Sequence, residues 1–153
     1  MKKFAFVAIA GAFAVAPLQA QTASADFSYS AVAPGAWTYR AVTGGSEAAF
    51  VDGGGGTRMV IACGKITRLV TLSRVSAAPA TTMSFWTSSA TRELASRFDQ
   101  PSGRVIAQLS GLDPLLDAIA FSRGHFAISM PGYPPLVLPA GTEIAHVVED
   151  CRA

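Results

Sequence analysis

Long apolar runs are missing from this 153-residue sequence after its first 20 residues. A membrane-spanning helix needs about 20 consecutive apolar residues, so we expect no transmembrane segment in the mature chain. Cysteine and histidine are scarce, with two residues of each. A zinc site takes three or four His, Cys or carboxylate ligands, usually at short spacings. We therefore predict no metal site and no cofactor.

An excess of charge of either sign is also missing. The sequence contains 12 Lys+Arg and 10 Asp+Glu, for a net charge of +2. Two of the basic residues, Lys2 and Lys3, lie in the N-terminal segment, which leaves ten basic and ten acidic residues in the rest. A nucleic-acid-binding surface needs clustered basic residues, and here they are scattered. We expect no nucleic-acid partner.

Catalytic motifs are absent as well. The sequence has no Gly-x-Ser-x-Gly pattern of the kind that forms a nucleophile elbow. The glycine run at 53–56, followed by Thr57 and Arg58, lacks the Gly-Lys-Ser/Thr of a phosphate-binding loop and precedes a strand pattern rather than a helix. We interpret this run as a loop between strands, and we predict no catalytic residue.

The first feature that the sequence does contain is an export signal. Two lysines precede an apolar run from Phe4 to Ala16, and a small residue, Ala20, follows soon after. A positive start, a short apolar run and a small residue at the cleavage position are typical of a secretory signal peptide. We predict a signal peptide over 1–20, with cleavage after Ala25 as the alternative. The mature protein is then expected in the periplasm or, after a further step, outside the cell.

The remaining chain is of a length that suits one domain. Residues 21–35 are rich in Ala, Ser, Thr, Gln and Pro and predict a flexible leader, which leaves 36–153 as a single β-rich domain. Cys63 and Cys151 both lie in this domain, and in an oxidising compartment they are expected to form a disulfide. We expect this bridge to fasten a C-terminal helix to a sheet.

Strand patterns dominate the domain. Short runs of β-branched and aromatic residues recur every 8–12 residues between turn signals, which is typical of all-β proteins. Gly64 and Lys65 are predicted to form a two-residue hairpin turn. We predict an antiparallel β-sandwich or curled sheet, with strands at 36–41, 47–51, 57–63, 66–72, 83–87, 91–94, 104–109, 125–130 and 135–138.

Two short helices are expected near the C-terminus. Asp113 followed by Pro114 is typical of a helix start, and Gly124 is expected to end that helix. The second helix is expected over 142–152, where Ile144, Val147, Val148 and Cys151 form one apolar stripe. The predicted fold class is therefore β-rich α+β.

Aromatic side chains with polar atoms are enriched at protein interfaces. Four residues of this kind are therefore candidates for a binding face: Trp37, Tyr39, Trp86 and Tyr133. The two histidines, His125 and His146, are the candidate bases if the protein is instead an enzyme. His146 lies one helical turn from both Glu143 and Asp150, a pattern that is more typical of a solvated helix face.

Two stretches resemble small exported proteins of Gram-negative bacteria: LDPLLDAIAFSRG at 112–124 and VVEDCR at 147–152. More distantly, the chain is similar to invasion-associated locus B-like proteins, which also combine an export signal, a β-sandwich, a helix and a late cysteine. This resemblance implies a fold and a location. It implies no activity and no catalytic residue.

These observations predict a non-enzymatic periplasmic binding or interaction module. Its expected partner is an envelope protein or a cell-wall component. Two alternatives remain open at this stage. One is a small hydrolase acting on envelope material, with His125 or His146 as base. The other is an inhibitor of a cell-wall hydrolase.

Overall fold

The computed structural model describes residues 25–153, so the predicted signal peptide lies outside the described residues. The described chain forms two antiparallel sheets and two helices, which confirms the predicted β-rich α+β class. In chain order the elements are β1 (Gly35–Val42), β2 (Gly45–Asp52), β3 (Thr57–Gly64), β4 (Leu69–Val75), β5 (Thr82–Trp86), β6 (Thr91–Ala95), β7 (Arg97–Asp99), β8 (Arg104–Ser110), α1 (Pro114–Ala120), β9 (His125–Met130), β10 (Tyr133–Pro139) and α2 (Thr142–Arg152).

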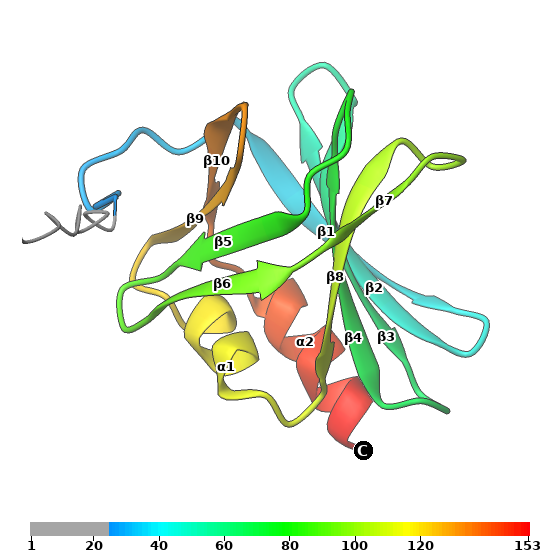
Figure 1. The fold of residues 1–153 in the computed structure, drawn as a ribbon. Coiled ribbons are helices and arrows are strands. Elements are labelled where there is room, and N and C mark those ends of the chain that lie inside the picture. The colour runs from blue at the N-terminus through cyan, green and yellow to red at the C-terminus, as the bar shows by residue number, and fades with distance from the viewer. Residues whose placement is uncertain (1–24) are drawn as a thin grey trace, which may run out of the picture.

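The strands divide into a six-stranded sheet, in the order β1-β2-β3-β4-β8-β7, and a four-stranded sheet, in the order β10-β9-β5-β6. In Figure 1 the four-stranded sheet lies to the left of most of the six-stranded sheet, and both helices lie below it. The chain passes from one sheet to the other between β6 and β7, at Ser96. One face of the six-stranded sheet is therefore covered partly by strands and partly by helices.

The core follows the alternation of the strands. On β3, Met59, Ile61 and Cys63 are buried while Val60 and Ala62 are partly exposed. Successive side chains on a strand point to opposite faces, so the three buried residues face the second layer. Cys63 therefore lies on the same face as the core residues Met59 and Ile61.

The connection between β3 and β4 differs from the prediction. The prediction of a two-residue turn at Gly64-Lys65 is wrong. The strands are joined by a four-residue loop, 65–68, and Cys63 pairs with Val70. Arg68 has a φ of 53°, and its amide donates a hydrogen bond to the Gly64 carbonyl at 2.8 Å. Ile66, predicted to begin the return strand, is 94% exposed. The longer loop leaves Ile66 outside the sheet.

Helix α2 packs on β2 and β3 through the apolar stripe predicted from the sequence. Ile144, Val147, Val148 and Cys151 are all buried. The disulfide between Cys63 and Cys151 is confirmed, with the two Cα atoms 5.4 Å apart. Burial of the stripe and the covalent bond together hold α2 against the six-stranded sheet.

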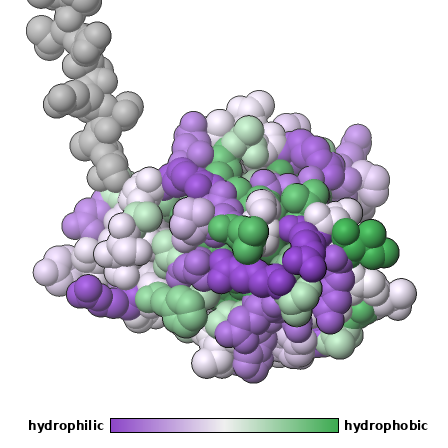
Figure 2. Space-filling view, turned by 90° about the horizontal axis from the view of Figure 1, so that it is seen from below, coloured by the Kyte–Doolittle hydropathy of each residue, from purple (hydrophilic) through white to green (hydrophobic). Residues whose placement is uncertain are grey.

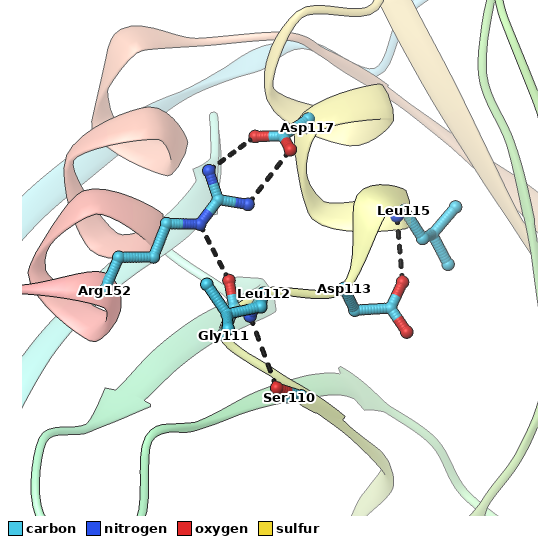
Figure 3. A network of polar contacts seen from close by, with 7 residues as sticks. All are labelled: Ser110, Gly111, Leu112, Asp113, Leu115, Asp117 and Arg152. Atoms are coloured by element: carbon cyan, nitrogen blue, oxygen red, sulfur yellow. Dashed lines mark hydrogen bonds and ion pairs between the residues drawn. The ribbon is translucent and has the colours of Figure 1, made fainter.

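A polar network joins the end of α2 to the start of α1 (Figure 3). The Arg152 guanidinium donates two hydrogen bonds to the Asp117 carboxylate, at 2.9 and 3.0 Å, and a third to the Gly111 carbonyl at 2.8 Å. Paired arginine–carboxylate bonds of this kind fix orientation as well as position. The two helices are therefore held together at their polar ends.

Asp113 caps α1 as the sequence predicts. Its Oδ1 accepts a hydrogen bond from the Leu115 amide at 2.9 Å, and its Oδ2 accepts one from Arg92 at 2.8 Å. The Arg92 hydrogen bond, and to a smaller extent the Leu115 amide, lower the pKa of Asp113 below 3.8 despite the opposing effect of burial. The ionised carboxylate therefore stabilises the folded state.

We expect Asp113→Ala to lower the free energy of unfolding by about 1 kcal/mol at neutral pH, the usual cost of a lost helix cap. Because the folded pKa is depressed, the stabilisation by Asp113 is fully present above pH 3.8 and is lost as the pH falls through the folded pKa. Urea unfolding at pH 7 and at pH 3 measures both effects. Asp113→Asn is the control, since asparagine caps a helix without the charge. An equal effect of Asp113→Ala at both pH values would contradict this assignment.

Of the predicted leader, 21–35, residues 25–34 contain no helix or strand, and Gly35 begins β1. They lie against the four-stranded sheet. The Ala33 amide donates a hydrogen bond to the Val137 carbonyl at 2.8 Å, and the Phe27 carbonyl is 2.8 Å from Nε2 of His125. Among the described residues, no helix is long and apolar enough to span a membrane.

Candidate functional site

The four aromatic residues predicted as a binding face lie in different environments. Trp37 is buried in the core, where its ring stacks on Phe126 and meets Phe50 edge to face. Its indole N–H donates a hydrogen bond to the Pro139 carbonyl at 2.8 Å. Trp37 therefore holds the two layers together and offers little surface to a partner.

Trp86 lies at the end of β5 beside the first described residues. Its ring stacks on the imidazole of His125 with the ring centroids 5.7 Å apart, and Phe27 meets it edge to face. These contacts occupy the imidazole of His125. Tyr133 lies elsewhere, at the start of β10, and no ring contact joins any two of the four predicted aromatic residues within 25–153.

Tyr39 and His146 belong to a polar cluster where β1 and β2 meet α2. The Tyr39 hydroxyl donates a hydrogen bond to Asp150 at 2.7 Å, and its ring meets His146 edge to face. The nearby Ser46 hydroxyl, and then the Tyr39 hydroxyl, lower the pKa of Asp150, and Asp150 raises the pKa of Tyr39. Ser46 is buried, and within 25–153 its Oγ makes no hydrogen bond of ordinary length.

This cluster contains serine, histidine and aspartate, but among the described residues no hydrogen bond joins the serine to the histidine. An activated serine needs a hydrogen-bonded base, and Ser46 has none among the described residues. The imidazole of His146 faces Tyr39 instead. The part of the chain that the structure describes also holds no group of three or more His, Cys, Asp or Glu residues that could bind a metal ion.

A cleft opens at the other end of the molecule, between the two sheets. In Figure 1 this end is at the top, where the β2–β3 loop, the end of β4 and the start of β10 come together. The cleft consists of two adjoining hollows, of about 240 Å³ and about 370 Å³, that share Arg58 and Leu136. Arg74, Val75 and Tyr133 line the first hollow, and Pro34 and the glycines at 53–54 line the second.

Arg74 is the most unusual residue of the cleft, because it occupies a core position. It pairs with Met59 on β3 and Val105 on β8, both fully buried, and is itself only 6% exposed. Its guanidinium donates hydrogen bonds to the carbonyls of Ile128, at 2.9 Å, and Pro134, at 2.6 Å. Burial, and then the charge of Arg58, lower the pKa of Arg74 to about 10.

The carbonyl of Pro134 is available to Arg74 because the pairing of β10 with β9 is irregular. Tyr133 pairs with Met130 and Leu136 pairs with Ile128, and the register shifts between them. Proline has no amide hydrogen to donate to a ladder, so the two prolines at 134–135 suit this interruption. The start of β10 thereby forms one wall of the cleft.

Arg58 enters the cleft through a β-bulge. Phe50 pairs with Met59, whereas Val51 pairs with Thr57, so Arg58 is an extra residue on β3. A bulge bends the strand and changes the direction of a side chain, and here Arg58 lies beside Arg74. The Arg58 guanidinium is 3.5 Å from the Asp52 carboxylate. Oδ1 of Asp52 also accepts the amide hydrogens of Gly54 and Gly56, which closes the glycine loop.

The sequence analysis missed both arginines as site residues. One signal for Arg74 was available, since Val70, Leu72 and Arg74 alternate on one face of a strand and the first two are core residues. A charged residue at a core position in such a pattern is uncommon unless it is paired. No comparable signal existed for Arg58, because a bulge depends on how two strands pair.

At the opposite end of the described chain, α1 and α2 border a hollow of about 30 Å³, which is much smaller than the cleft. Figure 2, which views this end from below, shows hydrophobic side chains in small groups separated by hydrophilic ones. Leu112 and Phe121 are two of the exposed apolar residues. Single apolar side chains are common on protein surfaces and need no functional explanation. They do not define a site.

Comparison of this chain with protein-family models, with curated proteins and with solved structures finds no match. The resemblance to invasion-associated locus B-like proteins stays a prediction.

Proposed function

We propose that this protein is a non-enzymatic binding module that acts in the periplasm after export, and that the cleft around Arg58 and Arg74 is its binding site. The observation that carries this proposal is the buried guanidinium of Arg74 at the base of an open cleft. Partly apolar clefts with a few fixed polar groups are the usual form of a ligand site. The partner is a component of the cell envelope.

Three features favour binding over hydrolysis. The residues that line the cleft include neither His125 nor His146 within the described chain. The carboxylate of Asp52, the acid among them, is engaged by Arg58 and two backbone amides. Ser76 also lines the cleft, and its hydroxyl donates a hydrogen bond to the Ala78 carbonyl at 2.6 Å rather than to a base.

Photocrosslinking in the producing cells tests this function. We expect benzoylphenylalanine at position 75, which lines the cleft, to capture an envelope component. The matched control is the same residue at position 42, since Val42 and Val75 are similarly exposed, at 37% and 42%, and Val42 lies outside the cleft. His125→Ala and His146→Ala should leave capture at position 75 unchanged.

Equal capture from positions 42 and 75, or an unprocessed chain confined to the cytoplasm, would overturn the proposal. The mass of the protein from the periplasmic fraction measures the processing. A chain that begins after Ala20 or Ala25 agrees with the predicted export. Loss of capture in a histidine variant that remains folded would favour the hydrolase alternative.

A further inference from the structure

We propose that the cleft binds an oxyanion, a carboxylate or phosphate group attached to an apolar body, between the guanidinium groups of Arg74 and Arg58. This inference rests on the proposed function, because it assigns the ligand class of the same cleft.

Among residues 25–153, Arg74 has no counter-ion. Within residues 25–153, the carboxylates that lie within 4 Å of an arginine belong to ion pairs of Arg40, Arg58, Arg92, Arg97 and Arg152. Arg74 is absent from these pairs although it is almost completely buried. Buried charges in proteins are normally paired. An anion from outside the chain would supply the missing partner.

Open donors on Arg74 remain for such an anion. A guanidinium carries five N–H groups, and two of them serve the carbonyls of Ile128 and Pro134. The other N–H groups have no acceptor among the described residues. Each nitrogen of Arg74 either donates one of these two hydrogen bonds or is accessible to solvent. The two carbonyls hold the plane of the guanidinium, so the orientation of its remaining donors is fixed in a side chain that lines the cleft.

Arg58 adds a second positive charge on the same side. Arg58, on the bulge in β3, lines the same hollow as Arg74, and the two like charges repel one another. Asp52 balances Arg58 only in part, because the pair is 3.5 Å apart and the Arg58 side chain is 48% exposed. An oxyanion between the two guanidinium groups would relieve the repulsion and accept hydrogen bonds from both.

The rest of the lining defines the remainder of the ligand. Apolar side chains form most of the walls, namely Ala33, Pro34, Val75, Ala77, Pro135 and Leu136. The larger hollow, of about 370 Å³, has the size of a small-molecule site, which is commonly about 300–1,000 Å³. A free inorganic ion would leave these walls uncovered. The lining therefore suits an oxyanion with a short apolar group.

Isothermal titration calorimetry of the mature protein with hexanoate, hexyl phosphate and hexanol tests this ligand class. We expect at least one of the two anions to bind and hexanol not to bind. Tighter binding of hexanoate identifies a carboxylate ligand, and tighter binding of hexyl phosphate identifies a phosphate ligand. Acetate and inorganic phosphate should bind more weakly than the hexyl compounds, because they leave the apolar walls uncovered.

Three variants assign the binding to this cleft. Arg74→Lys keeps the charge but loses the forked donors, and we expect it to weaken binding about tenfold, the loss typical of one charge-assisted hydrogen bond. Arg58→Gln changes an exposed residue and is expected to fold normally and to weaken binding about threefold to tenfold, as for a partly exposed charge. Arg123→Gln removes the same charge from an exposed site outside the cleft and should leave the affinity for the anion unchanged.

The inference is overturned if neither anion binds at millimolar concentration, if hexanol binds equally well, or if Arg58→Gln and Arg123→Gln have the same effect. These failures are separable from failure of the proposed function. Capture at position 75 without anion binding would support the proposed binding function and contradict the oxyanion as its ligand. Anion binding without capture of an envelope component would support the oxyanion site and contradict the envelope partner.

Discussion

Reduction of the disulfide between Cys63 and Cys151 is expected to lower the free energy of unfolding by roughly 4–5 kcal/mol, on the chain-entropy estimate for a loop of this length. The two cysteines are 88 residues apart, and the loop that they close includes most of the described domain. The bond restricts the unfolded chain far more than the folded one, because β3 and α2 are already packed together. A loss of this size is a large part of the 5–15 kcal/mol that typical domains possess.

Urea unfolding with and without reductant measures this loss. The variant Cys63→Ala/Cys151→Ala should unfold at a lower urea concentration than the oxidised protein, and reductant should have no further effect on it. That variant also controls for other effects of the reductant. An unchanged unfolding midpoint after complete reduction, verified by alkylation of both thiols, would contradict the prediction.

Trp37→Ala is expected to lower the free energy of unfolding by about 3–5 kcal/mol, as for other large aromatic residues removed from a core. The indole lies against Phe50 and Phe126, and it contributes a hydrogen bond to Pro139 across the two sheets. Its removal leaves a cavity and an unpaired carbonyl. Trp37→Phe keeps the packing in part and should have a smaller effect.

The matched control for Trp37→Ala is Tyr39→Ala, two residues along the same strand. Tyr39 is 38% exposed, so its removal should change stability only slightly. Thermal unfolding of the three variants beside the wild type gives the comparison. Full stability of Trp37→Ala with loss of partner capture would contradict the structural role of this tryptophan and favour the binding face predicted from the sequence.

Local patterns made several parts of this fold predictable. The bounds of α2 agree with the prediction over 142–152. Its apolar residues repeat at helical spacing, and this spacing fits a helix rather than a strand. The N-cap at Asp113 was predictable for a similar reason, since an aspartate followed by proline acts on the backbone next to it. The pairing of Cys63 with Cys151 required only that the sequence has two cysteines.

Most errors and omissions arose where the pairing of strands decides the outcome, although the predicted end of the first helix at Gly124 is also wrong, since α1 ends at Ala120. The turn after Gly64 was predicted to be too short, because loop length depends on the register that places Val70 opposite Cys63. The short strand β7 was not predicted. Its three residues, Arg97–Asp99, have no pattern of their own and are a strand because they pair with β8.

The sequence also could not decide which of the predicted aromatic residues are accessible to a partner. Trp37 and Tyr133 are both aromatic residues with a polar atom, and the sequence cannot distinguish the one in the core from the one in the cleft. A core position for Arg74 could be inferred from alternation along β4, but not that it would lack a carboxylate partner. That depends on which side chains the second sheet brings opposite it.

The sequence by itself determined the β-rich class, the two late helices, the disulfide and the near balance of charge, because each depends on local spacing or on composition. Only the tertiary structure decided the register of the sheets, the burial of Trp37 and the meeting of Arg58 with Arg74. The physical reason is that these features come from contacts between residues far apart in the chain, and in the case of Arg58 from a bulge that exists only when two strands pair.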